Sequence, residues 1–203
     1  MKSNRTDKWY INGKLRPHFA GKLRGYPGLK NTAKGIMKYV PHCKIYVEPF
    51  AGLGRTTEYV SADKIILNDM SDYAVNYLKN KFPKNTLDYR DIEITQEDFK
   101  ECILKHDSED TFFLIDPPWS KSIYTKNIDD NTDVKGIKIK PFCNITPSEY
   151  YRIIFDIIKT IKGKWLICMN HNRAYPKEYK STVIESTKTI MGYVIKTRIV
   201  YND

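Results

Sequence analysis

Cysteine is scarce in this sequence and shows no pattern. The chain has 203 residues but only four cysteines, and no two of them form a C-x-x-C pair. This spacing argues against a zinc site and against a disulfide framework, and we expect no bound metal. We therefore place the protein in a reducing interior: the cytoplasm, or the cytoplasm of a host cell if a virus or mobile element encodes it.

Long apolar runs are also missing. The N-terminus leads into polar sequence without an apolar leader segment, and no stretch is long enough to span a membrane. We find no internal repeat and no low-complexity block. The length and the ordinary apolar content of 41% suit one globular domain with a real core. The sequence therefore predicts a single domain over residues 1–203, with no membrane contact.

Acidic residues are too few to balance the basic ones. The chain has 34 Lys and Arg against 24 Asp and Glu, which gives a net charge of +10. A basic excess favours a polyanionic partner such as nucleic acid, although a solvated basic surface would have the same composition. Residues 1–25 form a basic N-terminal arm with interleaved aromatic residues, which could track phosphates and stack on bases, or pack against the domain.

The order of the apolar patterns predicts an α/β fold with a mostly parallel sheet. Strands are expected at 44–48, 64–67, 86–90, 111–115 and 164–169. Helices are expected at 31–40, from residue 55 or 56, at 72–82, after a capping box at 95–98, and from residue 147 up to Gly163. The Thr-, Val- and Ile-rich tail at 181–200 predicts an antiparallel hairpin on the sheet edge.

A glycine-rich turn lies between the first expected strand and the helix after it. The turn, Pro49-Phe50-Ala51-Gly52-Leu53-Gly54, lacks the third glycine of the dinucleotide fingerprint, but its glycines let a ligand approach the backbone closely. Asp69 follows the second strand, where an acid can bind ribose hydroxyls. Its alternative role is to cap the next helix, for which Ser71 is the better candidate.

Three acids, Asp69, Asp91 and Asp116, fall at the ends of three successive expected strands. In open α/β sheets ligands bind outside the carboxyl ends of the strands, so these carboxylates would face one cleft. Packing does not require acids at these positions. We therefore expect a ligand site at this edge of the sheet.

The tetrapeptide Asp116-Pro117-Pro118-Trp119 follows the apolar strand at 111–115. Its two prolines hold a stiff turn that continues neither strand nor helix. The Asp116 carboxylate and a backbone carbonyl oxygen then offer two acceptors, which suit the two N–H donors of an exocyclic amine. The Trp119 ring suits a flat heterocycle stacked beside it. A plain Asp-Pro turn is the alternative interpretation. A loop at 120–145 with many lysines follows, and its length favours a functional, substrate-facing role.

Five segments occur in a particular order along the chain: 26–30 (Tyr-Pro-Gly-Leu-Lys), 47–54, 68–69, 116–119 and 163–170. Together they resemble the D12-class (Dam-like) adenine-N6 DNA methyltransferases, whose tetrapeptide usually ends in Tyr rather than Trp. The resemblance implies a Rossmann-like class I methyltransferase sheet and S-adenosylmethionine as the methyl donor. It also implies cofactor contacts by Tyr26, Lys30, Pro49, Phe50, Gly52, Asp69 at the ribose, Asp91 at the adenine, and Asp116.

The same resemblance implies direct methyl transfer to a flipped-out adenine, with double-stranded DNA as the partner. The adenine would stack on Trp119 and Tyr124, and its N6 amine would donate hydrogen bonds to the Asp116 carboxylate and the Pro117 carbonyl oxygen. Lys121 would contact the nucleic acid backbone. Catalysis would come from positioning and charge stabilisation, without a covalent enzyme intermediate.

The chain departs from this family in its length. Only residues 91–115 separate the third expected strand from the tetrapeptide, which leaves no room for the usual inserted target-recognition domain. Sequence reading would then come from the 120–145 loop, the arm at 1–25, a partner protein or a homodimer. Adenine in RNA and a protein amide nitrogen are alternative substrates, because the tetrapeptide serves any planar amine. A catalytically idle nucleic-acid-binding subunit is the third alternative, and the intact Gly52, Asp69 and Asp116 argue against it.

Overall fold

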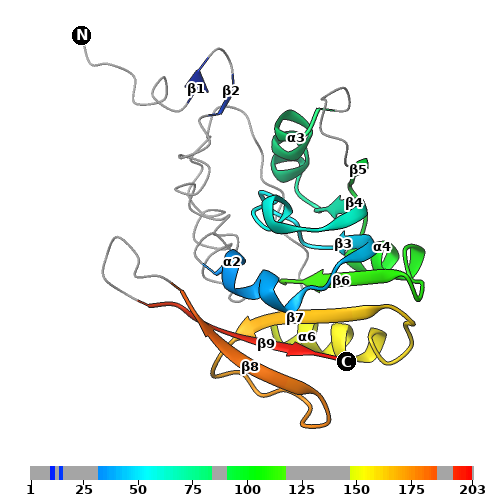
Figure 1. The fold of residues 1–203 in the computed structure, drawn as a ribbon, viewed down its shortest axis with the longest axis vertical. Coiled ribbons are helices and arrows are strands. Elements are labelled where there is room, and N and C mark those ends of the chain that lie inside the picture. The colour runs from blue at the N-terminus through cyan, green and yellow to red at the C-terminus, as the bar shows by residue number, and fades with distance from the viewer. Residues whose placement is uncertain are drawn as a thin grey trace.

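The computed structural model describes residues 10–11, 14–15, 32–83, 91–117, 147–186 and 194–202. Within these residues seven strands form one sheet in the order β5-β4-β3-β6-β7-β9-β8 (Figure 1). The strands are β3 Cys43–Glu48, β4 Ala62–Asn68, β5 Asp91–Thr95, β6 Thr111–Ile115, β7 Lys164–Asn170, β8 Lys180–Glu185 and β9 Lys196–Tyr201. A separate antiparallel ladder pairs β1, Tyr10–Ile11, with β2, Lys14–Leu15, in the segment expected to be an irregular arm.

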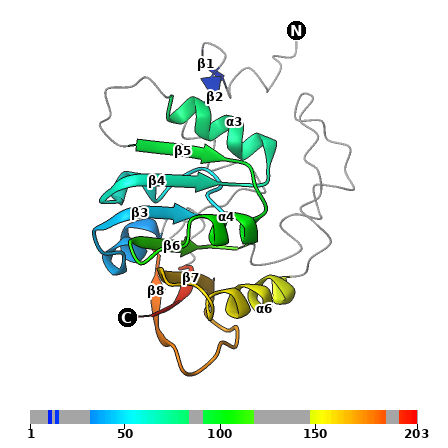
Figure 2. The same ribbon diagram turned by 90° about the vertical axis from the view of Figure 1, so that its right-hand side faces the viewer.

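Five neighbouring strands, β5, β4, β3, β6 and β7, run parallel, and Figure 2 shows the first four of them stacked in this order. Strand β9 runs antiparallel to both β7 and β8. The prediction of a mostly parallel α/β sheet with a C-terminal antiparallel hairpin is confirmed. Strand β6 is buried along its whole length, which explains why its sequence is continuously apolar rather than alternating.

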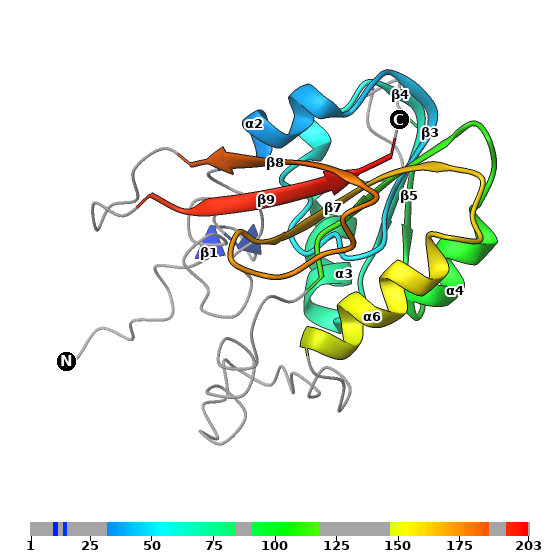
Figure 3. The same cartoon turned by 90° about the horizontal axis from the view of Figure 1, so that it is seen from below.

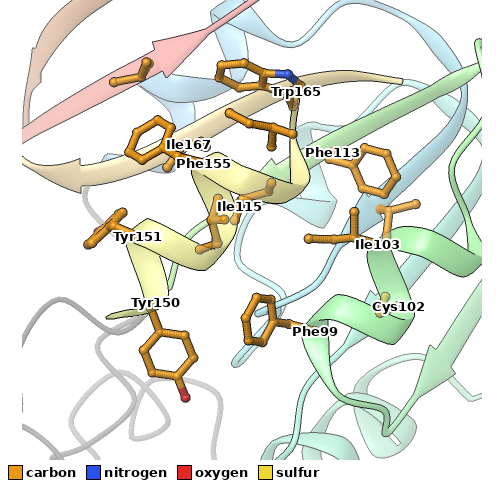
Figure 4. Close-up of a cluster of buried hydrophobic side chains, with 14 of the residues drawn as sticks. Phe99, Cys102, Ile103, Phe113, Ile115, Tyr150, Tyr151, Phe155, Trp165 and Ile167 are labelled. Carbon is orange, nitrogen blue, oxygen red and sulfur yellow. The ribbon is translucent and has the colours of Figure 1, made fainter. Parts of the chain in front are cut away.

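Helices cover both faces of the sheet. On one face, α4 (Phe99–Lys105) and α6 (Pro147–Ile157) enclose a core that includes Phe99, Ile103, Phe113, Tyr151, Phe155 and Trp165 (Figures 3 and 4). On the other face, side chains of α2 (Ala33–Ile36), the 3₁₀ turn η2 (Met37–Tyr39) and α3 (Asp72–Lys81) pack against the sheet. No helix in the described part of the chain is long and apolar enough to cross a membrane.

The prediction of a helix that begins at residue 55 or 56 is wrong. The structure has only the 3₁₀ turn η3, Thr57–Tyr59, between the glycine turn and β4. Strand β4 begins at Ala62, so the connection is too short for a regular helix, and the Thr56 hydroxyl is engaged by a side chain at the end of β3. By contrast, the expected helix at 72–82 is confirmed, and the Ser71 side chain caps it by accepting from Ala74 N.

The expected third strand also needs correction. Residues 84–90 lie outside the described part, and the strand that pairs with β4 is β5, Asp91–Thr95. Ile92 and Ile94 alternate with polar residues, as in a strand at the edge of a sheet. The predicted capping box at 95–98 places the start of the helix too early. The N-cap of α4 is Asp98 rather than Thr95, and the Asp98 side chain accepts a hydrogen bond from Lys100 N.

Candidate functional site

The carboxyl ends of β3 and β6 lie at the point where the order of the sheet reverses. From β3 the chain adds β4 and β5 on one side, then returns to add β6 and β7 on the other. Ligands in open α/β sheets bind outside the strands at such a switch point. The glycine turn follows β3 and Asp116 follows β6, so two predicted parts of the site come from neighbouring parallel strands.

The glycine turn has two residues in the left-handed backbone region. Gly52 has a φ of 52° and Gly54 a φ of 57°, which other residues rarely adopt. Their surroundings differ, because a Cβ added at Gly54 would lie 2.8 Å from Leu78 Cδ2, whereas one added at Gly52 would have nothing within 4 Å. Packing against α3 accounts for Gly54. The backbone at Gly52 instead borders open space, where a ligand could approach it.

Asp69 holds the glycine turn from the end of β4. Its Oδ2 accepts a hydrogen bond from Gly52 N at 2.9 Å, and its Oδ1 accepts one from Ser71 N at 2.9 Å. The residue is 7% exposed, and this burial raises the pKa of Asp69 to about 6, against the opposing effect of the two N–H donors. Each carboxylate oxygen has a second lone pair that could accept from a ligand hydroxyl.

Asn68, the last residue of β4, ties the glycine turn to the end of β5. Its Nδ2 donates to Pro49 O at 3.1 Å and to Glu97 O at 3.0 Å. Its Oδ1 accepts from Glu97 N at 2.8 Å and from Thr95 Oγ1 at 2.9 Å. A buried amide that is satisfied at both ends is a rigid support. The sequence analysis includes Asn68 only in the segment 68–69, because a sequence does not show which groups a side-chain amide contacts.

Glu48, the last residue of β3, is a buried acid that the sequence analysis missed. It is 3% exposed, and its Oε2 accepts a hydrogen bond from Thr56 Oγ1 at 2.6 Å. Burial raises the pKa of Glu48 to about 8, the Thr56 hydrogen bond opposes the rise, and Asp116 adds to it. The carboxyl group is therefore mostly protonated at neutral pH. Its position at a strand end beside the glycine turn is the signal that would have found it.

Asp116 and Pro117 follow β6, as the sequence predicted, with Asp116 half-buried and Pro117 buried. The Asp116 charge raises the pKa of Glu48 on β3 and adds to the effect of burial on the pKa of Cys168 on β7. The Asp116 carboxylate thus has an electrostatic effect on side chains of both strands that flank β6.

Phe50, in the glycine turn, belongs to an aromatic cluster drawn from three elements. Its ring centroid lies 5.0 Å from that of Phe99 on α4 and 5.8 Å from that of Tyr150 on α6, the latter edge-on. Figure 4 shows Phe99 and Tyr150 together at one end of the core. Met70, directly after Asp69, is 49% exposed.

Asp91 does not lie at this edge of the sheet. It is the first residue of β5, is exposed, and pairs with Lys64 near the start of β4. The prediction that Asp91 lies at the carboxyl end of a strand is wrong. The structure therefore does not support the implied contact of Asp91 with the cofactor adenine. The carboxyl end of β5 leads instead to Glu97 and Asp98.

Five predicted site residues lie outside the described part of the chain and stay predictions: Tyr26, Lys30, Trp119, Lys121 and Tyr124. Those that the structure brings to the carboxyl edge are Pro49, Phe50, Gly52, Asp69, Asp116 and Pro117. Among the described residues, no group of three or more His, Cys, Asp or Glu side chains could hold a metal ion.

No protein-family model and no curated protein matches this chain. Solved structures do match it. An rRNA methylase from Streptococcus thermophilus has a TM-score of 0.51 and 9% identity, over 85% of this chain and 95% of that one. A candidate methyltransferase from Streptococcus mutans in complex with SAH has a TM-score of 0.50 and 13% identity, over 84% and 96%. A candidate methyltransferase from Escherichia coli has a TM-score of 0.50 and 13% identity, over 86% of each chain. At these identities the likeness shows the fold: a Rossmann-like sheet of the kind found in methyltransferases.

Proposed function

We propose that this protein is an S-adenosylmethionine-dependent methyltransferase of the D12-like class, acting on the N6 amine of adenine in DNA. The observation that carries the proposal is the meeting of Asp116-Pro117 with the glycine turn at the switch point of the sheet. The cofactor class is supported by the fold and by the SAH bound to one structural neighbour. The segments at 26–30 and 163–170 support the narrower class.

The described residues fit this cofactor. The open space at Gly52 admits a ligand to the backbone of the turn, and the Asp69 oxygens suit ribose hydroxyls. Phe50, fixed by its ring contacts, lines the methionine end. S-adenosylmethionine supplies an electrophilic methyl group on a positively charged sulfur, and the Asp116 carboxylate at this edge suits a cationic ligand.

In the proposed reaction Asp116 and Pro117 orient the adenine. The N6 amine donates to the Asp116 carboxylate and to the Pro117 carbonyl oxygen, which directs the nitrogen lone pair toward the methyl group. The bound cofactor would supply the methyl group, so that N6 would gain an N–C bond as the S–C bond is lost, SAH would leave, and the surplus proton on the nitrogen would pass to water. Trp119 and Tyr124 stack on the extruded base, and Lys121 with the basic arm binds phosphates.

RNA is the second candidate substrate. The rRNA methylase among the structural neighbours favours it, and the net charge of +10 suits either nucleic acid. We place DNA first because the five ordered segments resemble DNA enzymes. A cytoplasmic location and a partner protein or homodimer that supplies sequence reading belong to the same proposal.

Incubation of matched DNA and RNA oligonucleotides with methyl-labelled S-adenosylmethionine, followed by nucleoside analysis, tests the function. We expect N6-methyladenine in the DNA. Label found only in the adenine of RNA would favour RNA, the second candidate substrate, over DNA. Label in neither nucleic acid, from a protein that binds the cofactor, would contradict the proposed substrate class.

Replacement of Asp69 by alanine should weaken cofactor binding. The variant loses the acceptor for the ribose and the bond that holds Gly52 N, and charged hydrogen bonds of this kind contribute about 1.5–3 kcal/mol. Isothermal calorimetry with S-adenosylmethionine measures the change. Asp63→Ala, on the exposed start of the same strand, is the control and should bind as the parent does. Unchanged affinity in folded Asp69→Ala would remove Asp69 from the site.

A further inference from the structure

The carbonyl groups of the glycine turn are bound by a lysine of α3. Lys81 Nζ donates to Gly54 O at 2.7 Å and to Leu53 O at 3.3 Å. In the expected arrangement a helix would follow the turn and fix these residues through its own backbone. Here only the short η3 follows, so side chains add to the two backbone hydrogen bonds of the turn, from Ala51 N to Asn68 O and from Gly54 N to Ala51 O.

Lys81 is held in this position by its surroundings. Its side chain is 20% exposed, its ammonium lies 4.9 Å from the centre of the Phe82 ring, and Glu58 lies 3.7 Å away. Burial lowers the pKa of Lys81, Arg55 lowers it further, and Glu58 and Glu48 oppose this. An ammonium that gives up water here needs the two carbonyl oxygens as acceptors, so the contact is specific rather than a loose surface pairing.

The glycine turn is therefore hydrogen-bonded to residues at both ends of α3. Asp69, just before the helix, binds Gly52 N, and Lys81, in its last turn, binds the oxygens of Leu53 and Gly54. Between them, Leu78 of the same helix packs where Gly54 has no side chain. These contacts orient the Ala51–Gly52 peptide group and the two peptide groups that follow Leu53, and so fix the turn on both sides of the position where the ligand is expected to approach.

We propose that Lys81 is a positioning residue for S-adenosylmethionine: it fixes the glycine turn in the shape that admits the cofactor, and does not contact the cofactor itself. This inference rests on the proposed function, since it assumes that the turn binds that cofactor. It assigns to one side chain of α3 the task that a helix after the turn would otherwise perform.

The test compares Lys81→Met, which keeps the length of the side chain but has no donor, with Lys81→Arg, which keeps the charge and donors. Lys79→Met, on the exposed side of the same helix, is the matched control. We measure dissociation constants for S-adenosylmethionine and SAH by calorimetry, and KM and kcat in the methylation assay. Lys81→Met should weaken binding of both ligands about 10- to 100-fold, the loss of charged hydrogen bonds that hold the turn. Its kcat at saturating cofactor should stay within about threefold of the parent, because the acceptors that orient the amine are untouched.

Lys81→Arg should restore most of the affinity, and Lys79→Met should bind normally. Folded Lys81→Met with parental affinity would overturn the inference, as would an equal loss in kcat with KM unchanged. If Lys81→Met does not fold, Lys81→Gln, which retains an amide donor, decides by the same KM-against-kcat comparison. Failure of the parent itself to bind S-adenosylmethionine would instead contradict the proposed function, so the two failures are distinguishable.

Discussion

Asp116→Asn should reduce methyl transfer by about 10²–10³-fold, the loss typical of removing one group that stabilises transition-state charge. The amide keeps the shape of the side chain but removes the negative charge that balances the developing positive charge on nitrogen. It also places an N–H₂ donor near the amine, where only acceptors are useful. The measurement is single-turnover methylation of a DNA oligonucleotide at saturating S-adenosylmethionine, so that any weakened cofactor binding does not account for the loss.

Asp110→Asn, at the other end of β6, is the matched control. Asp110 is exposed and pairs with Lys44, a surface contact that contributes little to stability. The control should keep parental turnover, and both variants should remain folded by circular dichroism. Near-normal turnover in Asp116→Asn would rule out the proposed mechanism, because no other described side chain is assigned to the amine.

Glu48→Gln should stabilise the protein at alkaline pH and leave it nearly unchanged at pH 5. Burial raises the pKa of Glu48 from 4.5 to about 8. Between these values the folded protein binds a proton that the unfolded chain releases, so the stability falls as pH rises from 4.5 to 8 and then levels off. A glutamine avoids the cost of ionising a buried carboxyl, which is on the order of several kcal/mol at pH 9. It can still accept the hydrogen bond from Thr56.

Urea unfolding at pH 5, 7 and 9 measures this effect. The difference between Glu48→Gln and the parent should grow with pH, reach most of its size near pH 8, and become constant above it. Glu101→Gln, exposed on α4, should show no such trend. Asp69, whose pKa rises to about 6, adds a smaller loss of stability between its ordinary value and pH 6 in every variant. A pH-independent difference for Glu48→Gln would show that folding does not raise the pKa of Glu48.

The parts of the fold that could be predicted from sequence are those whose burial leaves a one-dimensional pattern. Strand β6 is buried at every position and α3 has a serine cap with Val75 and Leu78 on one face, so both were expected correctly. The sequence predicts a strand at 86–90, but the strand that the structure describes is β5, where the alternation of Ile92 and Ile94 with polar residues is a weaker signal.

The candidate site divides in the same way. Gly52, Asp69 and Asp116 could be predicted because a strand end and a residue type suffice to place them. Glu48 carries the same strand-end signal, but the sequence does not show that its carboxyl group binds the Thr56 hydroxyl. Lys81 could not be predicted, because its role depends on two carbonyl oxygens that lie far from it in sequence. A charged residue in a sequence gives no sign of whether it will be buried.

Because residues of α3 and just before it bind the glycine turn, the affinity for the ligand and the packing of that helix against the sheet are thermodynamically coupled. Local fluctuations that lift the C-terminal turn of α3 away from the sheet would release the turn without unfolding the central strands. A substitution that loosens α3, such as one at Leu78, would therefore reduce occupancy of the site before it reduced global stability. The reverse also holds: a bound ligand would select the docked helix, so the far end of α3 would report on a site that it does not line.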